Sequence, residues 1–248
     1  MLFNGEVAIV TGGARGIGEE IVKEFSREGA KAVIFDINDE KGKAVEDAIK
    51  KNGGDALFVH CDVSNVDEIG KSVKLVIKKF GGINILVNNA GILHSTSIED
   101  ITEDEWDRIM AINLKGMFFA IQKILPSFEK AKGGKIVNIS SLAGRMGGFA
   151  NGLGYTATKA AMIGLTYGFA RRLADRNINV NAIAPGPTET DILKAFSEEK
   201  KEELRQLIPL KKLGTTKDIA YAVVFLSSSK AEFITGAILD VNGGMFMG

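Results

Sequence analysis

The chain has 248 residues, of which 45% are hydrophobic and 25% charged, the balance of a folded globular protein rather than a disordered one. Its 31 basic and 31 acidic side chains cancel, so the sequence offers no electrostatic footprint for nucleic acid or for an anionic membrane surface. One cysteine excludes an internal disulfide, and with two histidines it argues against a dedicated transition-metal site.

Short runs rich in β-branched residues alternate along the chain with longer stretches of helical periodicity. The runs predict strands at 6–11, 31–36, 55–62, 84–89, 135–140, 178–185 and 237–242, and the stretches predict helices at about 16–28, 39–51, 65–80, 102–130, 154–177 and 216–228. This alternation predicts one α/β domain over residues 1–248, a doubly wound, parallel seven-stranded sheet of Rossmann type with helices on both faces. Right-handed crossovers would place the strand C-termini along one edge, where ligands bind.

Two other features bear on organisation. No apolar run approaches the roughly 18 residues that a membrane span needs, and the N-terminus lacks the basic region and cleavage site of a secretory signal. We therefore expect a cytoplasmic protein with no membrane partner. The charged segment 188–212 is either a pair of solvated surface helices or a mobile lid over the substrate, and its position after a strand favours the lid.

A glycine-rich loop follows the first predicted strand. The sequence TGGARGIG (11–18) leads directly into a helical pattern. Gly12, Gly16 and Gly18 allow a tight turn and a close backbone approach, and the helix N-terminus offers unpaired N–H groups to a pyrophosphate. The spacing G-x-x-x-G-x-G differs from the common dinucleotide pattern G-x-G-x-x-G, so a plain structural turn remains an alternative.

The second predicted strand favours a nucleotide. It ends in Asp36, twenty residues after Gly16, where a carboxylate can accept hydrogen bonds from the adenosine ribose. The same charge repels a 2′-phosphate, and Ile37 supplies no compensating cation, so NAD is expected in preference to NADP. Arg15 in the loop could reach a 2′-phosphate and keeps NADP open.

In these and further segments the chain resembles the short-chain dehydrogenase/reductase family over essentially its whole length. The matching segments, in family order, are TGGARGIG (11–18), Asp36, CDV (61–63), NNAG (88–91), Asn113, NISS (138–141), YTATK (155–159), APGPTET (184–190) and ITGAILDVNGG (234–244). The resemblance implies hydride transfer between a nicotinamide cofactor and a carbonyl or secondary alcohol.

The resemblance also implies where the cofactor is held. Asp62 and Val63 would contact the adenine edge, Asn89 would pack beneath the cofactor, and Thr188 or Thr190 would reach the phosphates or the carboxamide. The full set implied is Gly12, Arg15, Gly16, Ile17, Gly18, Asp36, Asp62, Val63, Asn89, Tyr155, Lys159, Pro185, Gly186, Thr188 and Thr190.

Tyr155 and Lys159 are four residues apart, so both lie on one face of a predicted helix. A phenol has an ordinary pKa near 10, too high for efficient acid–base work at neutral pH. We expect the nearby ammonium to lower that pKa by favouring the phenolate. Alone, the pair is also a common surface pattern.

Three polar residues accompany this pair. Strand alternation lets one of Ser140 and Ser141 face the site, and the family pattern selects Ser141 to bind the substrate oxygen. Asn113 is either a satisfied core amide or, by resemblance, the holder of a water that links Lys159 to solvent. His94 follows the NNAG segment in a loop that either contacts substrate or is solvated.

The overall pattern is closest to 3-oxoacyl-(acyl carrier protein) reductases and related sugar and polyol dehydrogenases. Lys135 and Arg176 lie where such reductases carry basic residues for the carrier, although Asp36 favours a catabolic NAD-linked dehydrogenase. A non-catalytic nucleotide-binding scaffold is a third possibility. Related proteins are usually homotetramers, and the small residues of 154–177 would allow the close helix contacts of such an assembly.

Overall fold

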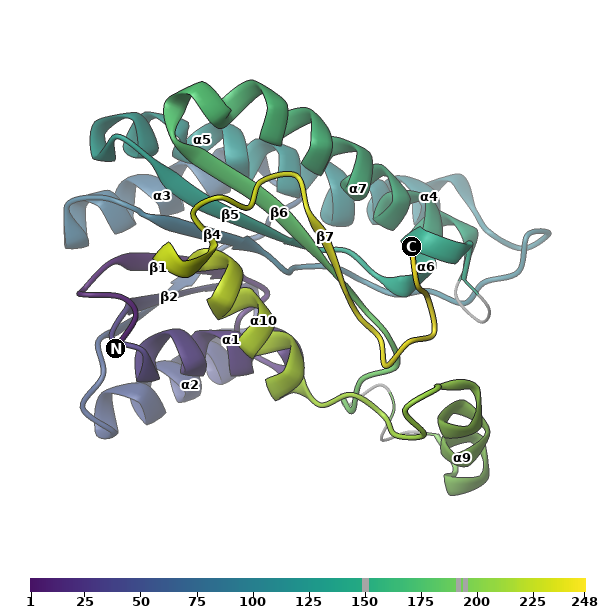
Figure 1. Ribbon diagram of the computed structural model, residues 1–248. Helices are drawn as coiled ribbons and strands as arrows, with labels where there is room; N and C mark the ends of the chain where they lie inside the picture. The colour runs from purple at the N-terminus through teal and green to yellow at the C-terminus, as the bar shows by residue number, and fades with distance from the viewer. Residues whose placement is uncertain (149–151, 191–192, 194–195) are drawn as a thin grey trace.

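The computed structural model describes residues 1–148, 152–190, 193 and 196–248, and it contains a seven-stranded parallel sheet between two layers of helices (Figure 1). The strand order is β3-β2-β1-β4-β5-β6-β7, and all neighbouring strands are parallel. The strands are β1 (Val7–Thr11), β2 (Lys31–Asp36), β3 (Ala56–His60), β4 (Ile85–Asn88), β5 (Gly134–Ile139), β6 (Ile178–Pro185) and β7 (Ile238–Val241). The predicted fold class is confirmed.

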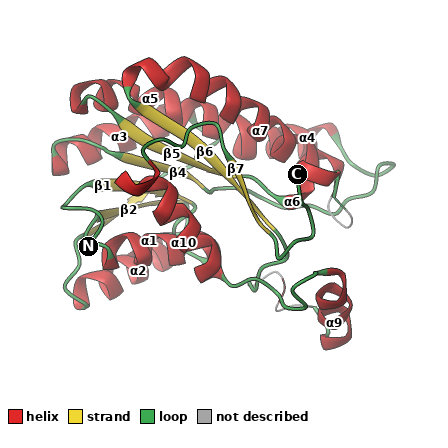
Figure 2. Ribbon diagram, viewed as in Figure 1, coloured by secondary structure: helices red, strands yellow, loops and turns green. Residues whose placement is uncertain are grey.

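Helices cover both faces of the sheet (Figure 2). One face carries α1 (Gly16–Arg27), α2 (Asp39–Lys51) and α10 (Thr216–Ser227), and the other carries α3 (Val66–Phe80), α5 (Gly116–Ala131) and α7 (Leu153–Leu173). Alternate side chains of each strand supply the two cores. In β1, Ala8 and Val10 belong to the cluster on the α1 side, whereas Val7 and Ile9 belong to the cluster on the α3 side.

The predicted helix 102–130 is one uninterrupted helical run that changes type in its middle. It consists of α4 (Glu103–Met110), a π-helical turn at Ala111–Lys115 and α5. π-Helical turns often occur at functional sites. By length and mean hydropathy (1.2) the run Glu103–Ala131 could cross a membrane, which differs from our expectation. A core helix of a soluble protein meets the same criterion, and one face of α5 packs against the sheet.

Two further elements lie outside the predicted strands and helices: a short helix that was not expected, and a surface helix within segment 188–212, where solvated helices were one of the two alternatives. The short helix α6 (Leu142–Met146) follows β5, and the C-terminus of the chain lies next to it (Figure 1). Within segment 188–212, α9 (Glu198–Leu207) stands away from the sheet and buries none of its residues. Residues 191, 192, 194 and 195 of that segment lie outside the described residues.

Candidate active site

The glycine loop lies between β1 and α1 at the C-terminal edge of the sheet. Gly12 has φ +65°, and a Cβ on Gly18 would lie 2.1 Å from the Gly12 carbonyl oxygen, so neither position accepts a side chain without a shift of the backbone. Helix α1 begins at Gly16, and its N-cap residue Arg15 makes no side-chain cap. The N–H groups of the first turn, Gly16–Gly18, are therefore available to an external acceptor. This cradle fits the pyrophosphate of a dinucleotide.

The end of β4 holds this loop in place. Asn89 donates from Nδ2 to the carbonyl oxygens of Thr11 and Gly12, both at 3.0 Å. Thr11 Oγ1 accepts the backbone N–H groups of Asn89 and Ala90, also at 3.0 Å. Asn89 thus fixes the start of the glycine loop, and its packing beneath a cofactor stays a prediction. No sequence pattern signals the part that Thr11 takes in this junction.

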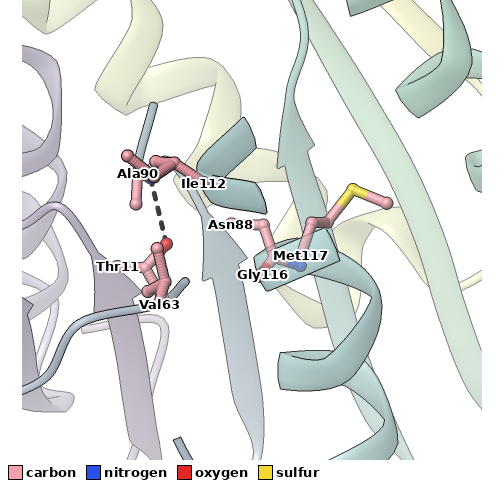
Figure 3. Close-up of a pocket in the computed structure, with 7 residues that line it drawn as sticks. All are labelled: Thr11, Val63, Asn88, Ala90, Ile112, Gly116 and Met117. Atoms are coloured by element: carbon pink, nitrogen blue, oxygen red, sulfur yellow. Dashed lines mark hydrogen bonds between the residues drawn. The ribbon is translucent and has the colours of Figure 1, made fainter. Parts of the chain in front are cut away.

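A small cavity of about 10 Å³ lies beside this junction (Figure 3). Its lining residues come from β1, β4, the segment after β3 and the start of α5: Thr11, Val63, Asn88, Ala90, Ile112, Gly116 and Met117. Its volume is close to that needed for a single water. Asn88 Oδ1 is buried without a hydrogen-bond partner among the described residues. Val63 is buried in this wall.

Asp36 lies at the end of β2, beside the glycine loop. Its carboxylate accepts the backbone N–H groups of Ala14 (3.1 Å) and Asn38 (3.0 Å), which hold an acceptor at the expected ribose position. Ile37 is 64% exposed and apolar. Arg15 is exposed, and it forms no ion pair within the described parts of the chain. Asp62 follows β3, and its carboxylate accepts the N–H of Ser64.

Ser141 and Tyr155 meet at the end of β5. Burial raises the pKa of Tyr155 above its ordinary value of 10.0, and a hydrogen bond with Ser141 partly offsets this rise. Ser141 is also the N-cap of α6 and accepts the N–H of Ala143. Ser140 lies on the other side of the strand end, where its hydroxyl donates to the Lys159 carbonyl oxygen at 2.8 Å. This geometry distinguishes the two serines.

Lys159 is almost completely buried below Tyr155. Its side chain donates from Nζ to the Ile139 carbonyl oxygen at 2.6 Å, and Nζ lies 5.5 Å from the centre of the Tyr155 ring. Burial lowers the pKa of Lys159 from 10.5 to about 8. Burial thus disfavours the charged form of both groups, and in the protein without a cofactor the net pKa of Tyr155 is raised. That Lys159 favours the phenolate stays a prediction.

Asn113 lies in the π-helical turn and is fully buried. Its side chain exchanges two hydrogen bonds with the backbone of Ile92 (2.8 and 3.0 Å) and donates to Thr158 Oγ1 at 3.3 Å. Asn113 is thus a satisfied core amide, one of the two expected alternatives. Asn113 Oδ1 and Lys159 Nζ both lie next to Gly91. That Asn113 holds a water linked to Lys159 stays a hypothesis.

The turn after β6 forms the remaining wall of the site. Pro185 ends the strand, and a Cβ on Gly186 would lie 2.8 Å from the Asn242 Cα. The Thr188 hydroxyl is buried and donates to the Gly186 carbonyl oxygen at 2.9 Å. Thr190 is half-buried at the start of segment 188–212.

His94 is buried next to Tyr155, which contradicts the expected solvated loop and leaves a contact with substrate a prediction. Its side chain is 7% exposed, so the loop is not solvated at this point. Its Nε2 accepts the backbone N–H of Tyr155 at 3.1 Å. No short-range pattern signals this contact, because 61 residues separate the two groups.

Other charged residues lie away from the site. Lys135, near the start of β5, donates to Asn179, and Arg176, just before β6, pairs with Glu129. Both are at the N-terminal edge of the sheet, so within one chain neither borders the Ser141–Tyr155 site. In the described residues no group of three or more His, Cys, Asp or Glu side chains could hold a metal ion.

Comparisons with known proteins agree with this geometry. A family model described as Enoyl-(Acyl carrier protein) reductase matches residues 12–246. The 3-oxoacyl-[acyl-carrier-protein] reductase FabG of Staphylococcus aureus is 44% identical over 97% of this chain and 98% of its own. The reductase of the same name from Aquifex aeolicus is 39% identical over 98% of both chains.

Solved structures show the same fold. The crystal structure of gox2181 is 32% identical and superposes with a TM-score of 0.94 over 98% of this chain and 96% of that one. A blue fluorescent protein from a metagenomic library, solved in complex with NADPH, is 34% identical with a TM-score of 0.92 over the full length of both. The chain therefore belongs to the short-chain dehydrogenase/reductase family of NAD(P)-dependent oxidoreductases that act on carbonyl and CH–OH groups.

Proposed function

We propose that this protein reduces a 3-oxoacyl thioester, carried by an acyl carrier protein or a smaller thiol, to the 3-hydroxyacyl compound. The relatives that are 38–44% identical over nearly the whole chain, from three bacterial genera, carry this activity in their names. The meeting of Ser141, Tyr155 and Lys159 supports the chemistry, because it places a hydroxyl, a phenol and an amine at one strand end.

In this proposal each side chain has a separate task. Ser141 binds the substrate oxygen and Tyr155 donates a proton to it. Lys159 holds the ribose of the nucleotide and supplies charge beneath the phenol, while Asn113 fixes the Gly91–Ile92 turn next to Lys159. The bound nicotinamide supplies the hydride, and the protein supplies its position and the electrostatics around it.

Tyr155 could serve either direction of the reaction. Its phenol would donate a proton in a reduction, and its phenolate would accept one in an oxidation. Burial raises the pKa of Tyr155, which keeps the phenol protonated but makes it a weaker acid, so the reductive direction is supported by the names of the relatives and not by this pKa.

We also propose that NAD(H) is preferred over NADP(H). The Asp36 carboxylate, held by two backbone N–H groups, would repel a 2′-phosphate, and Ile37 offers no cation. Replacing Asp36 with Ala should lower kcat/KM for NADH and raise kcat/KM for NADPH. Equal preference in the wild-type enzyme would contradict this proposal.

The second candidate is an NAD-linked dehydrogenase of a sugar, polyol or small secondary alcohol. Asp36 favours this candidate, because it favours NAD over NADP and catabolic oxidations commonly use NAD as the acceptor. The two candidates share the same catalytic residues and differ in the substrate and in the direction.

One assay separates them. Initial rates with an acetoacetyl thioester are compared for NADH and NADPH, and secondary alcohols, sugars and polyols are tested with NAD. Turnover of the thioester supports the reductase, and turnover of alcohols alone supports the second candidate. Tyr155→Phe should bind NADH normally but lose turnover by at least about 100-fold. Near-normal turnover in that variant would refute the role of Tyr155.

Three further proposals concern the molecule as a whole. We infer a homotetramer, because large apolar side chains are exposed on α10 and near β7 (Tyr221, Phe225, Phe233, Leu239) and on α5 and α7 (Phe118, Tyr167); a stable monomer in light scattering would refute it.

We propose that segment 188–212 covers the substrate, since its helix α9 has no buried residue. We propose a cytoplasmic location, with no nucleic acid or membrane as partner.

A further inference from the structure

The N-terminus of α7 has an unusual cap. The N-cap residue is Gly152, which has no side chain to accept the first N–H groups of the helix. Helices ordinarily satisfy the N–H two or three residues on with a Ser, Thr, Asp or Asn at the N-cap. Here His94 does so from a distant loop, because its Nε2 accepts the N–H of Tyr155 at 3.1 Å.

The residues around this contact are shaped for an imidazole. A Cβ on Gly152 would lie 2.2 Å from His94 Cε1, and a Cβ on Gly154 would lie 3.0 Å from Nε2. The Gly152 N–H also donates to the His94 carbonyl oxygen at 2.8 Å. The two glycines on either side of Leu153 therefore allow the ring to lie directly against the start of the helix.

The acceptor role fixes the protonation of the ring. A neutral imidazole accepts with one nitrogen and carries its proton on the other, so the proton lies on Nδ1. This atom is buried and makes no hydrogen bond among the described residues, but it lies 3.4 Å from Glu105 Oε1, and the same carboxylate oxygen accepts the Thr96 hydroxyl at 2.6 Å. Glu105 belongs to α4, which lies beside the start of α7 (Figure 1). The negative charge favours the Nδ1–H form.

We propose that His94, oriented by Glu105, is a positioning residue that fixes the backbone of Tyr155 and through it the phenol. The proposal rests on the proposed role of Tyr155 as proton donor. A misplacement of about 1 Å at a reacting group can lower the rate about 100-fold. The first turn of a helix without a cap is its least constrained part.

Three variants test the kinetic consequence. His94→Leu removes the acceptor, whereas His94→Gln keeps an oxygen near the position of Nε2. His60→Gln is the matched control, since the chain has two histidines and His60 is exposed and paired with Asp39. We expect His94→Leu to lower kcat at least about 10-fold and to leave the Kd for NADH unchanged. His94→Gln should retain most of the wild-type kcat. The control His60→Gln should match wild type in both constants.

Several outcomes would overturn the proposal. One is a kcat of His94→Leu equal to wild type while Tyr155→Phe is inactive. Another is an equal loss in His94→Leu and His94→Gln, because the acceptor would then be irrelevant. A purely structural role would lower the melting temperature and NADH affinity together with kcat.

A spectroscopic measurement keeps the proposal testable without turnover. Long-range ¹H–¹⁵N correlation of the two imidazoles reports which nitrogen carries the proton, and the His60→Gln variant assigns the signals. We expect Nε2 of His94 to carry no proton, because it accepts the N–H of Tyr155, and a proton on Nε2 would overturn the cap. If Tyr155→Phe retains turnover, the proposed role of Tyr155 as proton donor fails, while this spectrum still decides whether His94 caps the helix.

Discussion

Lys159 should destabilise the fold at neutral pH. Burial lowers its pKa to about 8 from 10.5, so between these values the unfolded chain binds a proton that the folded chain does not. The free energy of unfolding therefore rises with pH across this window. Each pKa unit corresponds to about 1.4 kcal/mol, so the charged side chain costs the folded protein roughly 3 kcal/mol below pH 8.

Replacing Lys159 with Met removes this cost. The variant also loses the hydrogen bond from Nζ to the Ile139 carbonyl oxygen, worth about 1 kcal/mol. We expect the free energy of unfolding of the variant to exceed that of wild type by roughly 2 kcal/mol at neutral pH. The difference should vanish at about pH 9.5, where the remaining cost of the charge equals the loss of the hydrogen bond. The same variant should lose turnover.

Urea denaturation without nucleotide, at several pH values and one protein concentration, measures the difference. Burial also raises the pKa of Cys61, which is present in both proteins and cancels. Tyr155 lies next to Lys159, but burial raises its pKa above 10.0, so measurements up to about pH 9.5 keep it protonated. Lys74→Met, on the exposed face of α3, serves as the control for the loss of a lysine. A pH-independent difference for Lys159→Met would refute the reasoning.

Other buried contacts lead to three more predictions. Gly18→Ala should cost about 1–3 kcal/mol in NADH binding, because its Cβ would lie 2.1 Å from the Gly12 carbonyl oxygen; an unchanged Kd in a fluorescence titration would contradict this. Asn138→Ala should lower the free energy of unfolding by roughly 2–3 kcal/mol, since it removes hydrogen bonds to Asn88 and Thr166; urea denaturation measures the loss, and an unchanged midpoint would exclude it. Burial raises the pKa of Cys61 to about 11, so a thiol reagent at about pH 8 should label it after unfolding and not before.

The sequence predicts the fold well because the pattern of the strands is strong. The central strands are short apolar runs buried on both faces, and the helices between strands carry apolar stripes, so the alternation itself specifies the parallel sheet. The predicted strand ends lie within two residues of those observed. The π-helical turn at Asn113 and the short helix α6 were not predicted. The π-helical turn escapes detection because one extra residue in a turn leaves the apolar pattern almost unchanged.

The site is less predictable than the fold, for a physical reason. Residues at strand ends, such as Asp36 and Ser141, could be placed because the topology brings strand ends together. The contact between His94 and Tyr155 depends on two glycines that make room for a ring from a distant loop. The sequence shows the glycines but not what approaches them.

Protonation was the least predictable property. Residue spacing suggested an ammonium that stabilises a phenolate, but a pKa responds to burial as well as to nearby charge. At this site burial has the dominant effect on both Tyr155 and Lys159, and it moves both toward their neutral forms. A site built in this way holds a proton on the phenol until a further charge enters it. Residue spacing alone could not predict this balance, because it gives the separation of the two groups but not the depth at which the fold buries them.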